Sequence, residues 1–384
     1  MLAFWVIYAV LLLIFVSRPV LVGWDSSEYL AYGKWLFSGY GFRAEYRPPV
    51  WPLLLGALWK LGFPMPFTMK ALTFLIYAAI PLVPLRSFED SRRYIGLLIA
   101  SHPLFASWTH LPLSHPIATL FFVLAYSSSG VLSGIFAAFS GLSRFTFLLY
   151  LPFICWKDRR RWAGSLSVLS LFFLWSWSLY GDPFLPLKSA SELINEPEYL
   201  WFWEKEPWFY LKAFAFSPLL VLGFLSRSRF TISALASLLY FSFLPHKEFR
   251  FFIDVLPSIS TVTVEAFNKL PLVIAAANLL VVPFFYHAAQ LPPEAWDFIP
   301  DGATVVGMTP EVNAYRNVYF KRWFYPAEIP DAEYCIYFDS AIPCATESCR
   351  EKKLRFRDSC DPLYSNGAFG LVVGLTRHPS AVPG

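Results

Sequence analysis

The stretch PHKEFRFF, residues 245–252, interrupts the apolar sequence late in the chain and lies between two hydrophobic segments. It places several ionisable side chains at a membrane boundary, where the bilayer selects against charge unless the charge has a function or a partner. If the backbone after the proline is helical, His246 and Arg250 share one face at i and i+4, with Lys247 three residues before Arg250. Such a cluster would hold an anion. The alternative is a self-neutralised helix cap, in which Glu248 pairs with one of the neighbouring cations.

Composition determines the class of protein to which this stretch belongs. The chain has 384 residues, of which 56% are hydrophobic and only 15% are charged, and its mean hydropathy is +0.48. A water-soluble globule of this length cannot bury so much apolar surface. Aromatic residues make up 19% of the chain, which suits rings at both membrane interfaces. The net charge of +4 is too small to indicate a nucleic-acid partner.

A series of apolar segments predicts an α-helical polytopic membrane protein. The first is 2–22, in which Arg18 near the end can snorkel outward. The others are 67–85, 94–108, 111–126, 131–143, 145–156, 162–180, 208–226, 230–244, 251–267 and 271–289. Together they predict about eleven crossings. Several segments are short for a ~30 Å hydrocarbon core, so we expect some half-helices or bends around a cavity.

The distribution of Lys and Arg predicts the orientation in the membrane. One side carries a concentration of these residues, which marks it as the cytoplasmic side. They are Arg86, Arg92, Arg93, Lys157, Arg159, Arg160, Arg161, Arg227, Arg229 and Lys269. The opposite side collects the first loop at 23–64, Arg144, the loop at 181–207, the cluster at 246–250 and everything after Leu291. All the candidate chemistry therefore shares one extracytoplasmic face of a cell membrane.

Hydropathy drops near residue 291, which predicts a membrane domain at 1–290 and a small soluble α/β domain at 291–384. Short β-branched or aromatic runs predict strands at 303–307, 334–338 and 369–373. Thr309 is expected to cap a helix that has Pro310 at its first position. This domain carries no Gly-rich phosphate loop, so a lid or an acceptor platform is favoured over a nucleotide site.

Four of the five cysteines lie in the last fifty residues, whereas Cys155 stands alone in the apolar part. The four are Cys335, Cys344, Cys349 and Cys360. Disulfides in an oxidising compartment are favoured over zinc, because no Cys-x-x-Cys spacing and no interspersed histidine is present. Three pairings are possible, and the sequence does not rank them.

The first loop contains two carboxylates, Asp25 and Glu28, at i and i+3 on one helical face. Short helices are expected along the interface at 26–36 and 50–61, separated by turns. Asp25 as N-cap and Glu28 at the capping-box position would explain both residues by local helix chemistry alone. Capping and catalysis are compatible. A glycosyl transfer with inversion needs one base for the proton of the acceptor hydroxyl, and Asp25 is the candidate.

The cationic side chains of the sequence indicate which residues would bind the phosphate of a lipid-linked sugar. Its developing charge can be stabilised by Arg, Lys and His without a divalent ion. Besides the cluster at 246–250, Arg47 and Arg144 are candidates for the same pocket. Three histidines, His102, His110 and His115, could bind a metal ion, but they more often cap turns, and no metal site is predicted.

Several motifs resemble the polyprenol-phosphate-sugar-dependent glycosyltransferases called GT-C. In the first loop these are DSSEY at 25–29, SGYG at 38–41 and YRPPVWPLLL at 46–55. GLSR at 141–144 and GDPF at 181–184 are similar to further recurring features of the same proteins. HKEFRF at 246–251 is similar to the motif of the eukaryotic mannosyltransferases of glycolipid-anchor and lipid-linked oligosaccharide assembly. The matches cover most of the first 255 residues.

This resemblance implies a polyprenyl (dolichyl) phosphate mannose donor, an external active site, metal independence and inversion at the sugar. It also places the essential acid of the first loop on Asp25. The chain departs from the family pattern in two places. Ser26 and Ser27 separate acidic residues that are commonly adjacent, and His115 stands where relatives often have an acid.

We therefore predict an inverting glycosyltransferase, with Asp25 as base, that moves mannose or another hexose to a glycolipid or lipid-linked glycan. No cofactor is predicted, since the lipid-phosphate sugar is a substrate. The predicted substrate-binding residues are Glu28, Tyr29, Arg47, Arg144, His246, Lys247, Glu248 and Arg250. The alternatives are a protein O-mannosyltransferase, a lipid or solute transporter, which also tolerates buried charge, and a catalytically dead scaffold.

Overall fold

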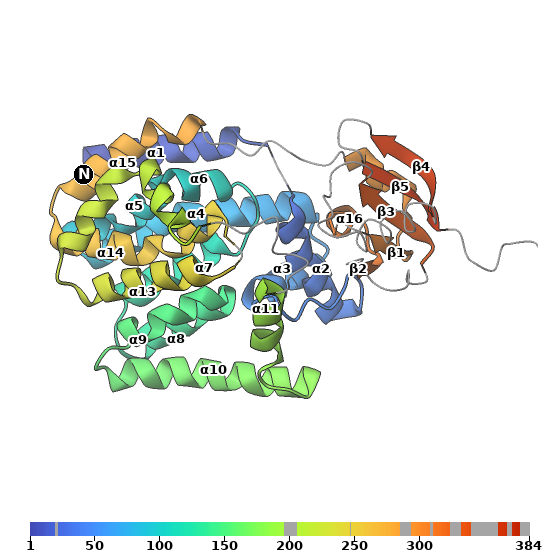
Figure 1. Ribbon diagram of the computed structural model, residues 1–384, viewed down its shortest axis with the longest axis horizontal. Helices are drawn as coiled ribbons and strands as arrows, with labels where there is room; N and C mark the ends of the chain where they lie inside the picture. Colours follow the sequence, from blue (N-terminus) through green and yellow to red (C-terminus); the bar gives the residue numbers. More distant parts are fainter. Residues whose placement is uncertain are drawn as a thin grey trace, which may run out of the picture. The chain divides into compact units, whose positions relative to one another are not determined.

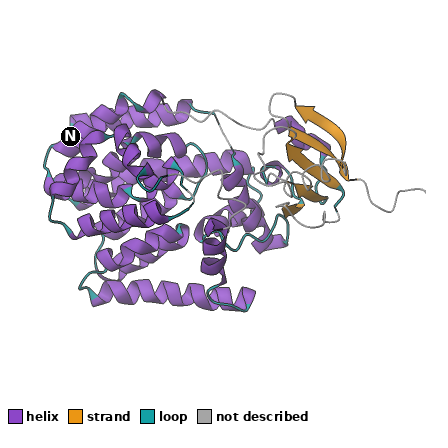
Figure 2. Cartoon of the chain, viewed as in Figure 1, coloured by secondary structure: helices purple, strands orange, loops and turns teal. Residues whose placement is uncertain are grey.

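The structure is a computed structural model in which the chain forms two compact units. Unit 1 comprises Met1–Val20, Glu45–Trp51 and Lys70–Ala288, and unit 2 comprises Leu21–Ala44, Pro52–Met69 and Ala289–Gly384. Within the part of the chain that the structure describes, strands occur in unit 2 alone, whereas unit 1 is helical (Figures 1 and 2). The described residues are 1–19, 22–195, 206–245, 247–284, 293–307, 310–322, 332–338, 360–366 and 371–376.

Unit 1 is a bundle of α-helices and 3-10 helices, the latter labelled η. Its elements are α1 (Leu2–Ser17), α4 (Met65–Ser87, from Lys70 onward), η1 (Ser91–Tyr94), α5 (Ile95–Ser101), α6 (Pro103–Trp108), α7 (His115–Ser127), α8 (Gly130–Ser143), η2 (Phe145–Tyr150), α9 (Leu151–Ile154), α10 (Arg159–Tyr180), α11 (Leu185–Asn195), η3 (Phe209–Phe216), η4 (Pro218–Leu225), α13 (Arg229–Phe243), η5 (Phe249–Asp254), α14 (Leu256–Ala266), α15 (Leu270–Leu279) and η6 (Val282–Phe284).

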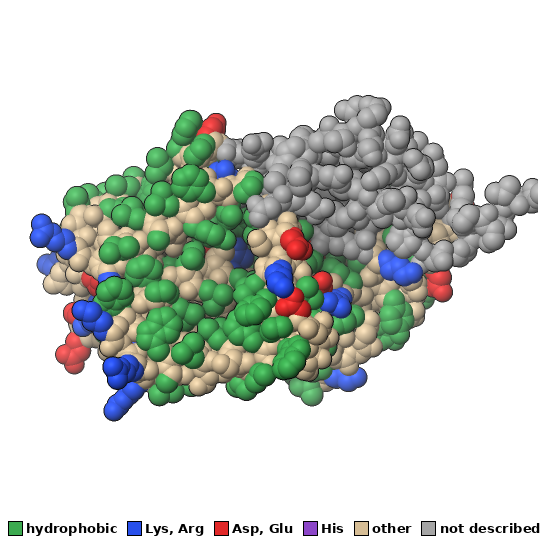
Figure 3. Space-filling model, turned by 60° about the horizontal axis from the view of Figure 1, so that its bottom comes forward, with side chains coloured by type: hydrophobic (Ala, Val, Ile, Leu, Met, Phe, Trp, Pro, Cys, Tyr) green, Lys and Arg blue, Asp and Glu red, His purple; other side chains and the backbone are tan. Residues whose placement is uncertain are grey.

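Two of the described helices, α4 and α10, are long and apolar enough to cross a membrane, and others such as α1, α7, α8 and α13 are apolar but shorter. Large apolar side chains of α10 point outward, with Leu171 67% and Trp177 61% exposed. Hydrophobic side chains are likewise spread over the face of the molecule in Figure 3. Such a surface suits lipid rather than water. The number of crossings stays a prediction.

Prolines break two of the predicted segments into shorter helices. The segment at 94–108 divides into α5 and α6 at His102, whose backbone is extended because Pro103 follows it. The segment at 208–226 divides into η3 and η4 at Ser217, again directly before a proline. The expectation of broken helices is confirmed at these two places.

Glycines allow the close packing of α8 against α10. A Cβ atom on Gly134 would lie 1.8 Å from the carbonyl oxygen of Arg161, and one on Gly164 would lie 2.1 Å from that of Val131. Small residues at the crossing of two helices permit this approach of backbones, as is common between membrane helices. The neighbouring α7 packs on α8 as well, so α8 contacts both α7 and α10 within unit 1.

Unit 2 contains a five-stranded sheet in the order β2-β1-β3-β5-β4. β1 pairs in parallel with β2 and β3, whereas β5 runs antiparallel to β3 and β4. Buried Trp296, Val305, Ile336 and Val373 are part of its core. A disulfide joins Cys335 to Cys360. The strands are β1 (Thr304–Gly307), β2 (Tyr319–Arg322), β3 (Tyr334–Phe338), β4 (Cys360–Asn366) and β5 (Leu371–Thr376), with η7 (Pro293–Phe298) before them.

Three of these strands, β1, β3 and β5, were predicted, and β2 and β4 were not. The helix expected to begin at Pro310 is α16 (Val312–Tyr315), which begins two residues later after Glu311, so that prediction is wrong. Its expected cap, Thr309, lies outside the described residues, as do Cys344 and Cys349.

Most of the first loop belongs to the same unit as the C-terminal sheet, and Glu45–Trp51 belongs to unit 1. Its helices are α2 (Trp24–Ser38) and α3 (Val50–Lys60, in unit 2 from Pro52 onward), which confirms both predicted interface helices as helices. Gly41 forms an isolated parallel bridge with Tyr319 of β2. Lys34 Nζ donates to the carbonyl oxygens of Asn313 and Arg316 and to Asn317 Oδ1, at 2.7, 2.9 and 2.9 Å. The division of the chain therefore differs from the predicted boundary between residues 290 and 291.

Candidate functional site

The first-loop carboxylates lie on the first two turns of α2. The helix begins at Trp24 after Gly23, and neither Asp25 nor Glu28 caps it, so the capping interpretation is wrong. Instead, Trp24 Nε1 donates to Glu28 Oε1 at 2.7 Å. Glu28 and Tyr29 are buried, with exposures of 0% and 2%, whereas Asp25 is half-buried. Asp25 is thus accessible beside a carboxylate that a tryptophan holds in place.

Glu311, which the sequence reasoning passed over, belongs to this carboxylate group. It directly precedes α16, which packs against α2, and its side chain is buried with 8% exposure. Burial, together with the negative charges of Glu28 and Asp25, raises the pKa of Glu311 to about 8. Unit 2 therefore contains three carboxyl groups that affect one another electrostatically.

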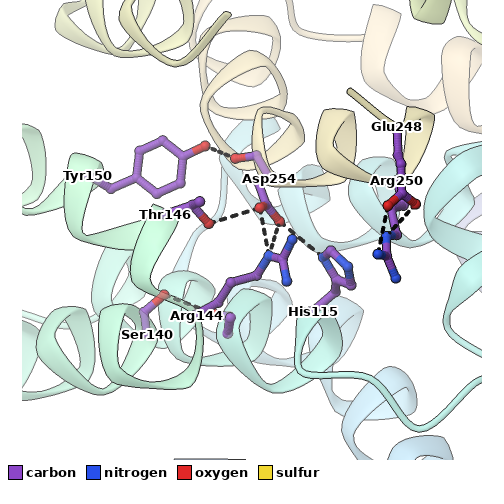
Figure 4. A network of polar contacts seen from close by, with 9 residues as sticks. His115, Ser140, Arg144, Thr146, Tyr150, Glu248, Arg250 and Asp254 are labelled. Atoms are coloured by element: carbon purple, nitrogen blue, oxygen red, sulfur yellow. Dashed lines mark hydrogen bonds and ion pairs between the residues drawn. The ribbon is translucent and has the colours of Figure 1, made fainter. Parts of the chain in front are cut away.

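A second polar centre lies in unit 1 around Asp254, a residue that the sequence reasoning also missed (Figure 4). Asp254 is 1% exposed and pairs with Arg144, whose Nε lies 2.6 Å from both carboxylate oxygens. His115 Nδ1 lies 3.0 Å from Asp254 Oδ1, and Thr146 Oγ1 donates to Oδ2 at 2.8 Å. The Tyr150 hydroxyl donates to the backbone carbonyl of Asp254. The Asp254 carboxylate thus contacts three side chains, which come from α7, from η2 and from the residue after α8.

This network gives Arg144 a structural explanation. The sequence offered no partner for a charge in such apolar surroundings, and a substrate phosphate was proposed in that role. Asp254 supplies a buried counter-charge 110 positions along the chain. The signal that could have identified it is the rule already applied to Arg144: a charged residue within an apolar segment, here 251–267, needs a partner or a function.

The run at 247–250 is not one helical turn. The helix that contains Arg250 begins only at Phe249, and the backbone of Glu248 is extended, so this helix does not extend back toward residue 246. The prediction of a shared helical face is wrong for that reason. His246 itself lies outside the described residues. Lys247 is buried, with 6% exposure.

Glu248 and Arg250 form a two-pronged ion pair, as the cap alternative suggested. Arg250 Nε lies 2.6 Å from Glu248 Oε2, and Nη2 donates to Oε1 at 2.8 Å. The guanidinium also lies over the Trp108 ring, 5.7 Å from its centroid. Arg250 is near enough to His115 for their charges to interact, so this pair lies beside the Asp254 network (Figure 4).

Two further residues considered from the sequence are Arg47 and His102. Arg47 is half-buried in unit 1 and lies over the ring of Tyr46, at 5.3 Å. His102 Nδ1 accepts from the backbone N–H of Leu104 and caps α6, which confirms the turn-cap interpretation for this histidine. In the described stretches, no three His, Cys, Asp or Glu side chains are grouped so that they could hold a metal ion.

Comparison with known proteins identifies the fold. No protein-family model and no curated protein matches the chain. Among solved structures, it is similar to ArnT from Cupriavidus metallidurans bound to undecaprenyl phosphate, with a TM-score of 0.61, and to the same protein in the apo state, with 0.63. Each match covers 98% of both chains at 11% identity. The chain therefore has a fold similar to that of ArnT, and the predicted helical architecture with a small C-terminal sheet is confirmed.

Proposed function

We propose that the chain is a membrane glycosyltransferase of the GT-C type that takes its sugar from a polyprenyl-phosphate donor. The observation that carries the proposal is the fold match to ArnT, a glycosyltransferase that was solved with undecaprenyl phosphate bound, over 98% of both chains. The sugar is mannose or another hexose, and the acceptor is a glycolipid or a lipid-linked glycan. Both specificities rest on the sequence motifs. The site faces the extracytoplasmic side.

Asp25 is the base in this proposal. It removes the proton from the acceptor hydroxyl as the hydroxyl oxygen attacks the anomeric carbon of the donor sugar. The bond between that carbon and the phosphate oxygen breaks, and the polyprenyl phosphate leaves with the electron pair. The half-buried position of Asp25 and its freedom from a capping role support this assignment. Glu28, held by Trp24, and Tyr29 bind the acceptor beside it.

Unit 1 supplies the groups for the donor phosphate. Lys247 and Arg250 bring positive charge to a largely buried position, where an ionic hydrogen bond is stronger than in water. Glu248 orients the Arg250 guanidinium through its two-pronged contact. Arg144, held by Asp254, and Arg47 are further donors in the proposal. His246 is assigned to the donor phosphate from the sequence motif alone.

The test is a transfer assay with the full chain in lipid nanodiscs, a polyprenyl-phosphate mannose and three acceptors: a glycolipid, a lipid-linked glycan and a Ser/Thr peptide. We expect transfer to one of the lipid acceptors, also with chelator present. Asp25→Asn should reduce it by a factor of about 100 or more. Asp297→Asn is the matched control, because Asp297 lies in the same unit and is 72% exposed.

Other outcomes distinguish the alternatives. Transfer to the peptide alone would identify a protein O-mannosyltransferase. Full activity of Asp25→Asn would remove the proposed base. Solute or lipid flux in proteoliposomes, without any transfer, would overturn the glycosyltransferase assignment in favour of a transporter.

A further inference from the structure

Four buried polar oxygen atoms on α2 and beside or within α16 have no hydrogen-bond partner among the described residues. They are Ser26 Oγ, Ser27 Oγ, Glu311 Oε2 and Asn313 Oδ1. Buried polar groups almost always have a partner, so such a concentration needs an explanation. Two of them, on Ser26 and Ser27, lie on the same helix as Asp25 and Glu28, and the other two belong to the segment at α16, which packs against that helix.

The contact between α2 and α16 is fixed by Lys34. Its ammonium group has three N–H donors, and three acceptors meet it, the carbonyl oxygens of Asn313 and Arg316 and Asn317 Oδ1. Lys34 is 2% exposed. This anchor holds Glu311, two residues before Asn313, beside α2. The backbone that carries Glu311 is therefore fixed by a contact within unit 2.

Two buried groups at this contact change charge between pH 6 and pH 9. Burial lowers the pKa of Lys34 to about 7, against the opposing effect of Asp301, so the effect of Glu311 is measured as the difference between a Glu311 variant and the parent chain, in which Lys34 is the same. With its raised pKa, Glu311 is neutral at pH 6 and ionised at pH 9, and the negative groups that act on it are Glu28 and Asp25 of α2. The charged neighbours on the other side of α16 neutralise each other, since Arg316 Nη2 lies 2.5 Å from Asp297 Oδ1. Loss of the Glu311 proton thus adds a third negative charge to a group that already has two.

We propose that Glu311 is a third carboxyl of the first-loop site, a positioning residue that holds one proton and thereby keeps α2, with the base Asp25, in place. The inference rests on the proposed function for the role of Asp25. When Glu311 is neutral, the group carries two negative charges at most and α16 stays packed on α2. When Glu311 is ionised in its buried position, repulsion and desolvation both oppose that packing.

The experiment measures thermal unfolding of the full chain in nanodiscs at pH 6 and pH 9, and it needs no activity. Glu311→Gln keeps the shape of the neutral acid but cannot ionise. We expect its stability advantage over the parent chain to be larger at pH 9 than at pH 6, because the loss begins above the unfolded pKa of 4.5 and is complete only above the folded pKa of about 8. In an Asp25→Asn background the gain at pH 9 should shrink, because one repelling charge is gone. Glu294→Gln, an exposed carboxyl of the same unit, is the control and should show no such gain.

The following outcomes would contradict the proposed role of Glu311. A Glu311→Gln variant with the same pH dependence as the parent refutes it, and so does a gain that Asp25→Asn leaves unchanged. Should Glu311→Gln fail to fold, Asp25→Asn alone must gain more stability relative to the parent chain at pH 9 than at pH 6, a difference in which the titration of Lys34 cancels. Failure of the parent chain to transfer sugar, with this coupling intact, would refute the proposed function only.

In the transfer assay, the same variants separate positioning from mere stability. The rate of the parent chain should fall above pH 8, whereas the rate of Glu311→Gln, relative to its own rate at neutral pH, should fall less. A rate that falls equally in both chains would overturn the positioning role.

Discussion

Replacement of Asp254 by Asn should destabilise unit 1 strongly, because it removes the counter-charge of Arg144 and changes little else in shape. The carboxylate is 1% exposed, and the Arg144 side chain is 14% exposed, so water cannot compensate. Loss of one partner of a buried ion pair costs about 3–5 kcal/mol, most of which is the penalty of the unpaired charge. His115 and Thr146 lose part of their contact with Asp254 as well, and these losses overlap with the first rather than add to it.

The assay is unfolding of the purified chain in mixed detergent micelles. Asp90→Asn is the matched control, because Asp90 pairs with Arg92 at 2.8 Å while both side chains are about half exposed, at 52% and 46%. That pair should contribute less than about 1 kcal/mol. The combination of Arg144→Met with Asp254→Leu should recover most of the loss, since an apolar pair leaves no buried charge.

Two results would refute this reasoning. Equal losses for Asp254→Asn and Asp90→Asn would mean that burial of the pair is irrelevant to its energy. A double variant less stable than either single variant would mean that the two side chains act independently and that their charges are not the reason for the loss.

Three further predictions concern unit 2. Glu311 has its pKa raised from 4.5 to about 8, so the folded state binds the extra proton, and the Glu311 contribution to stability should fall as pH rises through that range, by up to about 5 kcal/mol, measured in unfolding scans as the growing advantage of Glu311→Gln over the parent chain. Lys34→Met removes three hydrogen bonds, two of them to backbone carbonyls, while Asn317 Oδ1 keeps its bond from Trp59 Nε1; it should cost about 2–4 kcal/mol at neutral pH, whereas Lys60→Met, at an exposed site, should change stability by less than about 0.5 kcal/mol. Cys335→Ser opens a disulfide between residues 25 positions apart and should cost about 3 kcal/mol, with no further loss when a reductant is added.

The local elements of this fold were readable from the sequence because each has a local cause. Amphipathic and aromatic patterns between turns predicted α2 and α3, and short β-branched runs predicted β1, β3 and β5. β2, with the sequence YFKR, and β4, with CDPLYSN, lack such a run, because they alternate charged, polar and proline residues at the two edges of the sheet. Edge strands commonly carry such residues, so they leave a weak signal.

Long-range partners could not be read in the same way. Arg144 was recognised as an unusual charge, but its partner Asp254 is 110 positions away, and no local pattern connects the two. The first loop contacts the C-terminal sheet through a bridge between Gly41 and Tyr319, and a hydropathy pattern does not predict such a contact. Hydropathy divides a chain into apolar and polar stretches, whereas a compact unit is defined by which polar stretches pack together.

An arginine that is already ion-paired can still serve a phosphate. Arg250 Nη2 donates to Glu248 Oε1 and Nε lies 2.6 Å from Oε2, and a guanidinium has five N–H donors in one plane, so this pair orients the group without using every donor. With Glu248 counted against Lys247 and Arg250, the run 247–250 has a net charge of one positive unit. A sugar-phosphate-lipid diester carries one negative charge, which this run matches. Cleavage of the sugar bond leaves a monoester with a second charge, and in the proposed reaction that second charge is the reason for a further cation such as Arg47.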